Sequence, residues 1–266
     1  MADLFLELDD DLIERLTGEA DAAGINVEDY ARKLLYQNAP IFCHDVTLAG
    51  ASEQPLSDDP LCRGAEIEIE ARRLGYDLGW RFIMCPQANM ATAKLLFVTL
   101  NPGGKERHGP SWSQELGSAY RVEAWNGCEP GKARLQQQVQ ALFTLLDVCD
   151  DEVFSANYVP FRSPSWDALP HRNAALRFSD RLWRSIYPKI SFDIIVCMGK
   201  EQPAKPLASL CGAQFESSHL VGWGAVTADR YRLADGRKLI ALPHLSRFSI
   251  FDREKSIDRL REVFEL

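Results

Sequence analysis

The feature that most constrains the fold is an alternation of apolar runs with amphipathic segments between residues 94 and 264. Apolar runs of about 5 to 7 residues, bounded by turn residues, are typical of strands that are buried on both faces. We expect strands at 94–100, 153–157, 193–198 and 238–242. Apolar residues at helical spacing predict helices at 133–146, 177–187 and 257–264. The alternation predicts an α/β fold, a three-layer α/β/α arrangement with a mainly parallel central sheet.

The first 38 residues follow a different pattern. An alternating segment at 4–8 predicts a short strand, and two helices with cap signals follow it, the second starting at Val27. This small N-terminal strand-helix-helix resembles the ribbon-helix-helix fold of dimeric repressors. Glu7 on the strand would repel phosphate, so a homodimer through residues 1–38, or domain packing, is favoured over DNA reading. We expect a linker and a helix (at 66–74) over residues 39–82, and the main domain over 83–266.

Charge is divided unevenly along the chain. The formal net charge is −8, but residues 1–62 contain 14 acidic and 3 basic side chains, and residues 63–266 contain 24 acidic and 27 basic. The larger part is mildly basic, which permits contact with phosphate groups. No apolar run reaches the roughly 18 residues of a membrane span, and the acidic start argues against secretory and mitochondrial signals. We expect a cytoplasmic protein with no membrane partner.

The seven cysteines are scattered and include no Cys-x-x-Cys pair. This spacing argues against a disulfide framework, a zinc ribbon and an iron–sulfur cluster. We expect no metal and no cofactor.

Polar residues follow three of the expected strands, namely Asn101, Asn157 and His244. The carboxyl ends of parallel strands meet at one rim of a sheet, where ligands bind. Each residue taken alone is more often a turn or core residue than a functional one. Their shared position predicts a site at this rim.

Three segments around these residues carry a family resemblance. They are Phe-Val-Thr-Leu-Asn-Pro-Gly at 97–103, Phe-Ser-Ala-Asn-Tyr-Val-Pro-Phe-Arg at 154–162 and Leu-Pro-His-Leu-Ser-Arg-Phe at 242–248. Together they resemble the uracil-DNA glycosylase superfamily over residues 83–266, the first segment in the Asn-Pro-Gly form of its mismatch-specific branch. Asn101 stands where the most efficient uracil enzymes have Asp, so strong general-base activation of water is not expected.

The resemblance implies a role for each of these residues. Asn101 would orient water and His244 would stabilise the departing base, while Asn157 would read the edge of a flipped pyrimidine. Tyr120 or Trp112 is the candidate for stacking on that base. The candidate DNA contacts are Leu245, Ser246, Arg247, Phe248, Arg162 and Lys200. The backbone turn at the site is formed by Pro102, Gly103 and Gly104.

The sequence therefore favours a monofunctional DNA glycosylase that removes uracil or a modified pyrimidine, in repair or in anti-phage defence. A non-catalytic DNA-binding or regulatory protein on the same scaffold is the main alternative. A hydrolase of free nucleosides or nucleotides is a third. The identity of the base and the choice between single and double strands stay open at this stage.

Overall fold

The computed structural model describes Thr17 and residues 60–266. The strand-helix-helix expected at 1–38 and the linker expected from residue 39 lie outside the described residues, apart from Thr17. The helix expected at 66–74 is confirmed as α3, which begins earlier and spans Pro60–Arg73.

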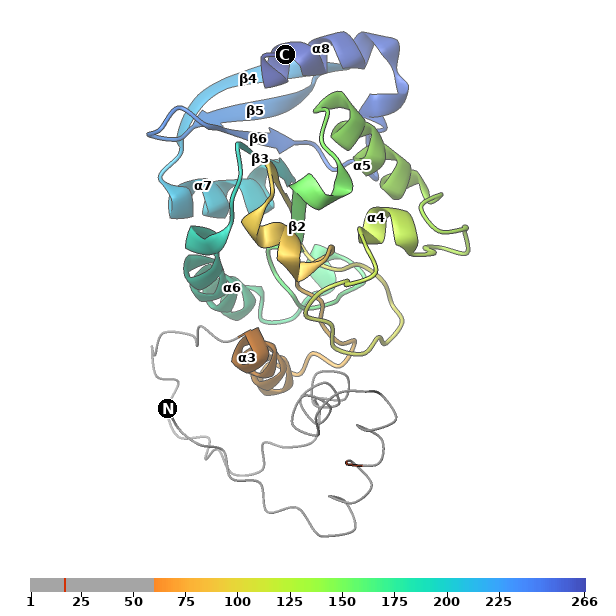
Figure 1. Cartoon of the computed structure of the whole chain (residues 1–266), viewed down its shortest axis with the longest axis vertical. Helices are drawn as coiled ribbons and strands as arrows, with labels where there is room; N and C mark the ends of the chain where they lie inside the picture. The colour runs from red at the N-terminus through yellow and green to blue at the C-terminus, as the bar shows by residue number, and fades with distance from the viewer. Residues whose placement is uncertain (1–16, 18–59) are drawn as a thin grey trace. The chain divides into compact units, whose positions relative to one another are not determined.

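A six-stranded mixed sheet forms the centre of the described part of the chain (Figure 1). Its strands are β1 (Leu95–Thr99), β2 (Val153–Asn157), β3 (Ile194–Met198), β4 (Gln214–Trp223), β5 (Val226–Arg232) and β6 (Lys238–Leu242). The order across the sheet is β2-β1-β3-β6-β5-β4. The first four of these neighbours run parallel to one another, and all four are strands that the apolar runs predicted. The expected α/β fold with a mainly parallel sheet is confirmed.

The antiparallel hairpin of β4 and β5 was not predicted from the sequence. β4 is mostly exposed and rich in polar residues, so it lacks the apolar run by which the other strands were found. Within residues 60–266 it pairs only with β5, with two irregularities in register, whereas β5 also pairs antiparallel with β6. The hairpin therefore adds two antiparallel strands to one edge of the parallel sheet.

Helices cover the sheet on both faces, because alternate strand residues point to opposite sides and both sets are apolar. One core cluster joins the sheet to α3, α6 (Arg172–Ile186) and α7 (Lys205–Cys211). The other joins it to α4 (Ala119–Val122), α5 (Arg134–Leu145) and α8 (Glu254–Phe264). Short helical turns lie at Gln87–Ala91, Asp150–Glu152, Trp166–Ala168, Tyr187–Lys189, Lys200–Ala204 and Ile250–Asp252.

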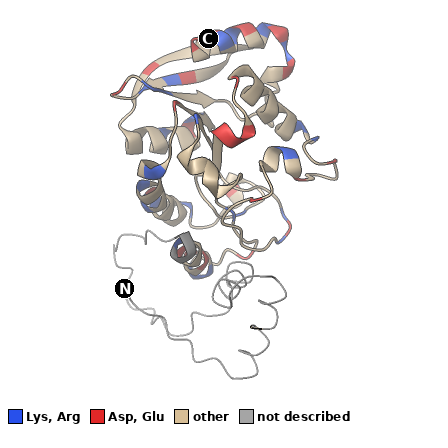
Figure 2. Ribbon diagram, viewed as in Figure 1, with Lys and Arg blue, Asp and Glu red and all other residues tan. Residues whose placement is uncertain are grey.

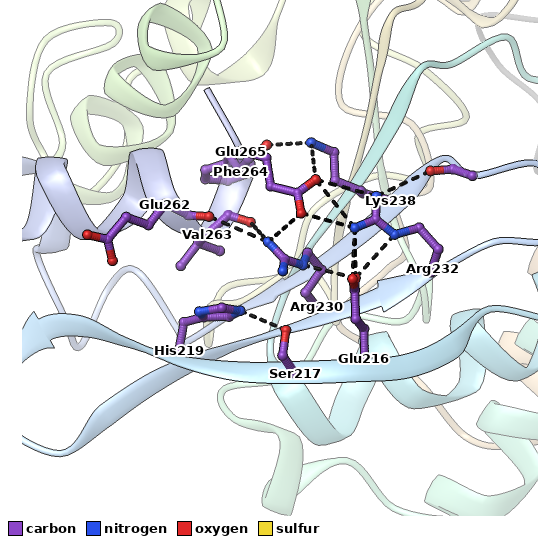
Figure 3. A network of polar contacts seen from close by, with 11 residues as sticks. Glu216, Ser217, His219, Arg230, Arg232, Lys238, Glu262, Val263, Phe264 and Glu265 are labelled. Carbon is purple, nitrogen blue, oxygen red and sulfur yellow. Dashed lines mark hydrogen bonds and ion pairs between the residues drawn. The ribbon is translucent and has the colours of Figure 1, made fainter.

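A network of charges fastens the end of α8 to the hairpin (Figure 3). Glu265 forms ion pairs with Arg230, Arg232 and Lys238, and Glu216 on β4 forms ion pairs with the two arginines. Arg230 and Lys238 also donate to backbone carbonyl groups in the last turn of α8. Cations at this position favour the helix, because the carbonyl end of a helix carries partial negative charge.

Basic and acidic residues are interspersed along the described ribbon, and the charged residues of α6 are mainly basic (Figure 2). The basic residues of α6 are Arg172, Arg177, Arg181 and Arg184. Among the described residues, no helix is both long enough and apolar enough to cross a membrane.

Candidate functional site at the carboxyl rim

Three polar residues follow neighbouring strands of the parallel sheet at its carboxyl rim. Asn101, Lys200 and His244 each come two residues after the end of their strand. Val98 pairs with Cys197, and Met198 pairs with Leu242, so the ends of β1, β3 and β6 are in register. The turns that carry Asn101, Lys200 and His244 therefore leave neighbouring strands at the same rim of the sheet.

The amide of Asn101 is held in one orientation. Its Nδ2 donates to Ser163 Oγ at 2.8 Å and more weakly to the carbonyl oxygens of Phe161 and Pro102. Ser163 Oγ gives its own hydrogen to the carbonyl oxygen of Ser165 at 2.8 Å, so it must accept from Asn101. Within residues 60–266, Asn101 Oδ1 has neither a hydrogen-bond donor nor full burial. This oxygen is therefore free to accept a hydrogen bond from water or substrate.

The turn after Asn101 places backbone against an arginine. Pro102 is buried, whereas Gly103 and Gly104 are exposed. The carbonyl oxygen of Gly103 accepts a hydrogen bond from Arg162 Nη1. Gly104 has a φ of +118°, and a Cβ there would lie 3.4 Å from the same nitrogen. The conformation favours glycine at this position and brings the backbone close to Arg162.

Asn157 is buried and its amide has partners at both ends. Oδ1 accepts from Thr99 Oγ1 at 2.8 Å, and Nδ2 donates to the carbonyl oxygen of Arg81 at 3.1 Å. Its exposed fraction is 2%. Asn157 thus links β2 to β1 and to the segment around Arg81, with one N–H and one lone pair left over.

The two aromatic candidates do not lie together. Tyr120 is 2% exposed and packs edge-on against Phe97 in the core cluster that includes α5. Burial raises its pKa well above the ordinary value, so the phenol stays neutral. Trp112 is half-buried, stacks on Phe82 and packs against the other core cluster. The structure therefore places the two rings against opposite faces of the sheet.

Lys200 is held by side chains from the hairpin. Its ammonium nitrogen lies 2.7 Å from Asp229 Oδ1 and 2.6 Å from Thr227 Oγ1, and Ser218 donates to Asp229. The turn that presents Lys200 begins at Gly199, where φ is +126° and a Cβ would lie 2.0 Å from the carbonyl oxygen of Gln202. Lys200 is thus already neutralised by a carboxylate, unlike a free phosphate-binding lysine.

His244 has a defined tautomer. The backbone N–H of Ser246 approaches His244 Nδ1 at 3.4 Å, and Ser246 Oγ lies 2.7 Å from the same atom. A nitrogen that accepts from a backbone N–H carries no proton, so the hydrogen of the neutral ring is on Nε2. Desolvation by surrounding protein, followed by the positive charge of Arg247, lowers the pKa of His244. The ring is therefore a neutral donor at pH 7.

The remainder of this turn divides into surface and core. Ser246 and Arg247 are exposed, and Phe248 is half-buried against Trp223. Leu245 is completely buried in the core cluster shared with α8. In this structure Leu245 does not project toward solvent.

Several residues at this rim were missed as site residues by sequence reasoning. Ser163 fixes Asn101 from 62 residues away, and Asp229 fixes Lys200 from a strand that was not predicted. Arg81 and Glu123 form a partly buried ion pair beside Arg162. Of these residues, only Glu123 lies in a segment with a local signal, the stretch rich in charged and aromatic residues between Lys105 and Trp125. Among the described residues, no group of three or more His, Cys, Asp or Glu side chains could hold a metal ion.

Comparison with known proteins gives no family for this chain. No protein-family model matches it, and no curated protein matches it significantly.

Proposed function

We propose that this chain is a monofunctional DNA glycosylase that removes uracil or a modified pyrimidine. The observation that carries the proposal is the orientation of Asn101. The Ser165–Ser163–Asn101 chain of hydrogen bonds turns Nδ2 inward and leaves Oδ1 free at the carboxyl rim. An amide oxygen in that position can hold a water molecule for attack on a sugar carbon.

The reaction places two demands on the site. Hydrolysis of an N-glycosidic bond develops positive charge on the sugar and negative charge on the departing base, as in glycoside hydrolysis. Asn101 Oδ1 orients the water, but an amide does not act as a strong base. The rate then depends on stabilising the base anion, for which His244 offers its Nε2 hydrogen. Asn101 and His244 follow β1 and β6, which β3 separates in the sheet, so the nucleotide would lie across the rim between them.

His244 fits this role in its neutral form, because a protonated ring would be repelled by the positive charge of Arg247. A neutral N–H stabilises a developing anion without first attracting a counter-ion. Ser246 fixes the tautomer through both its backbone N–H and its hydroxyl group. Base release should accordingly stay constant from about pH 7 upward.

Recognition of the base is assigned to the remaining polar capacity of Asn157, whose second N–H and second lone pair match the amide-like edge of a pyrimidine. Stacking by Tyr120 requires the ring to become exposed first, and Trp112 lies against the other face of the sheet. Ser246 and Arg247 are the exposed residues of the 242–248 segment that can reach a duplex. Their loop takes the contact role that buried Leu245 does not offer.

The test is release of bases from DNA that carries uracil, mismatched thymine or modified cytosines, in single and double strands. Wild type, Asn101→Ala and Gln137→Ala would be compared, the last being an exposed amide on α5. Abasic sites made by wild type and Gln137→Ala, but not by Asn101→Ala, support the proposal. Equal release of bases by all three proteins would contradict the proposal.

A non-catalytic DNA-binding protein is the second candidate. It is favoured by one observation, the burial of Tyr120 and Leu245, which keeps one stacking candidate and one DNA-contact candidate away from solvent. In that case DNA binding persists while no base is released by any of the three proteins.

A further inference from the structure

A pair of arginines lies beside the Asn101 turn. Arg81 and Arg162 come from neighbouring backbone, because Arg81 N donates to the carbonyl oxygen of Pro160 and Arg162 N donates to that of Gly79. The two side chains are close enough for the positive charge of Arg81 to contribute to lowering the pKa of Arg162, after burial as the larger cause. Two cations placed together in a partly buried position repel one another unless anions accompany them.

Among the described residues, one carboxylate, that of Glu123, forms an ion pair with this pair of arginines. Glu123 accepts from Arg81 through both oxygens, at 2.6 and 2.8 Å. Burial raises the pKa of Glu123, but hydrogen bonds from Arg81, Trp125 and Gln114 outweigh it and lower the pKa, so Glu123 is an anion. Within residues 60–266, no acidic side chain forms an ion pair with Arg162. The group of Arg81, Arg162 and Glu123 therefore carries one unbalanced positive charge.

The guanidinium of Arg162 has unused donors. Its Nη1 donates to the carbonyl oxygen of Gly103 at an exposed position. The Nε atoms of Arg162 and Arg81 are both buried and lack a hydrogen-bond partner within the described part of the chain. Buried donors without acceptors are costly and rare in folded proteins. Arg162 Nη2 also has no partner within residues 60–266, and unlike the two Nε atoms it is not buried. An acceptor from outside the chain can therefore reach Nη2 beside the exposed glycine turn.

We propose that Arg162, backed by Arg81, binds one phosphate group beside Asn101. Planar guanidinium groups recognise phosphate oxygens through paired hydrogen bonds. A phosphodiester carries one negative charge, which matches the single unbalanced positive charge of the group. Ser163 follows Arg162 directly and holds Asn101, so a phosphate bound here belongs to the nucleotide whose sugar meets Asn101. This placement rests on the proposed function, whereas the phosphate site itself does not.

Glu123 tunes the strength of this site. It neutralises the charge of Arg81 and therefore competes with an incoming anion for this arginine. Replacing Glu123 by Gln keeps the shape of the side chain and one acceptor oxygen, for either Trp125 or Gln114, but frees the charge of Arg81. Opposite effects of Arg162→Gln and Glu123→Gln on phosphate binding are therefore expected, and loss of folding alone would not produce them.

The experiment measures DNA affinity with duplexes in which one phosphate at a time is replaced by a neutral methylphosphonate. In wild type, one linkage near the target nucleotide should weaken binding about 10-fold, as for loss of a charge-assisted contact. Arg162→Gln should bind unmodified DNA about 10-fold more weakly and show no further loss at that linkage. The slope of log K against log salt should fall by about 1 in Arg162→Gln and rise in Glu123→Gln. Arg177→Gln, an exposed arginine on α6, is the matched control.

The outcomes separate this site from the catalytic proposal, because binding is measured without base release. A methylphosphonate effect that survives in Arg162→Gln would overturn the proposal, as would equal behaviour of Arg162→Gln and Arg177→Gln. A second arm adds inorganic phosphate and follows thermal unfolding. Stabilisation of wild type that is lost in Arg162→Gln, without any methylphosphonate effect, supports the site with a free phosphate ester as its ligand. Thermal unfolding of each variant without ligand controls for folding.

Discussion

Asn101 Nδ2 and Ser163 Oγ are 2.8 Å apart, and the direction of their hydrogen bond is fixed by the contact of Ser163 with the Ser165 carbonyl group. Two segments that follow different strands are joined by this bond. Because the bond fixes Nδ2, the oxygen Oδ1 of the same amide is left without a partner from residues 60–266. The orientation of Asn101 is therefore a property of the fold and not of a ligand.

Ser163→Ala should slow base release without abolishing it. The variant loses the acceptor that orients Asn101, so the amide is free to rotate and hold water less often in position. We expect a loss of about 10-fold, equivalent to about 1.4 kcal/mol in the barrier. Single-turnover release at saturating enzyme measures this directly. Ser209→Ala, an exposed serine on α7, should behave as wild type. Identical rates for Ser163→Ala and wild type would remove the orienting role.

Arg247→Gln should raise the pKa of His244. Desolvation and the charge of Arg247 both lower that pKa, and the variant removes the second cause. The shift is measured by NMR titration of the ring protons, with Arg259→Gln on α8 as the control. The protein should also lose stability as pH falls below about 6.5, the unfolded value, because the unfolded chain then binds the proton more readily. An unchanged titration in Arg247→Gln contradicts the electrostatic cause.

Lys200 and Asp229 should be energetically coupled. A double-mutant cycle with Lys200→Met and Asp229→Asn is expected to give about 1 kcal/mol, since the pair is partly buried. Urea unfolding supplies the four free energies. The pair of Lys205 and Glu201 on the surface is the comparison, and its coupling should be smaller because solvent screens exposed charges. Coupling at Lys200 no larger than on the surface would mean that the ion pair does not hold the turn.

Glu265→Gln should lower the melting temperature at pH 7. Hydrogen bonds from Arg232 lower the pKa of Glu265, and Lys238 contributes in the same direction. A lowered pKa in the folded state stabilises the protein above the unfolded value, and this contribution disappears as pH falls through the folded value. Wild type and the variant should therefore differ at pH 7 and converge near pH 3. High salt should also shrink the difference, because the network is exposed. A difference that persists at pH 3 would point to packing instead.

The parallel strands could be predicted because they are short, mainly apolar runs buried on both faces, as Ile194–Met198 illustrates. The hairpin could not be predicted in the same way. β4 is an edge strand with an exposed Phe215 and many polar residues, so neither alternation nor hydrophobicity distinguishes it from a loop. Its stability comes from pairing with β5 and from α8, which are contacts distant in sequence.

The location of the candidate site at the rim could be predicted from the sequence, but the contacts of its side chains could not. The positions of Asn101 and His244 after their strands follow from topology alone. The burial of Leu245 and Tyr120 does not, because apolar side chains in a turn or short helix are equally compatible with surface and core. The partner of Asn101 also lies beyond local reasoning, since hydrogen bonds between loops depend on the folded arrangement.

Asp229 and Arg230 are consecutive on β5, so their side chains point to opposite faces of the sheet. Asp229 holds Lys200 at the rim, and Arg230 holds the last turn of α8. β5 therefore connects Lys200 at the rim to the last turn of α8. We therefore expect a change at Glu265, which pairs with Arg230, to affect Lys200 through this strand.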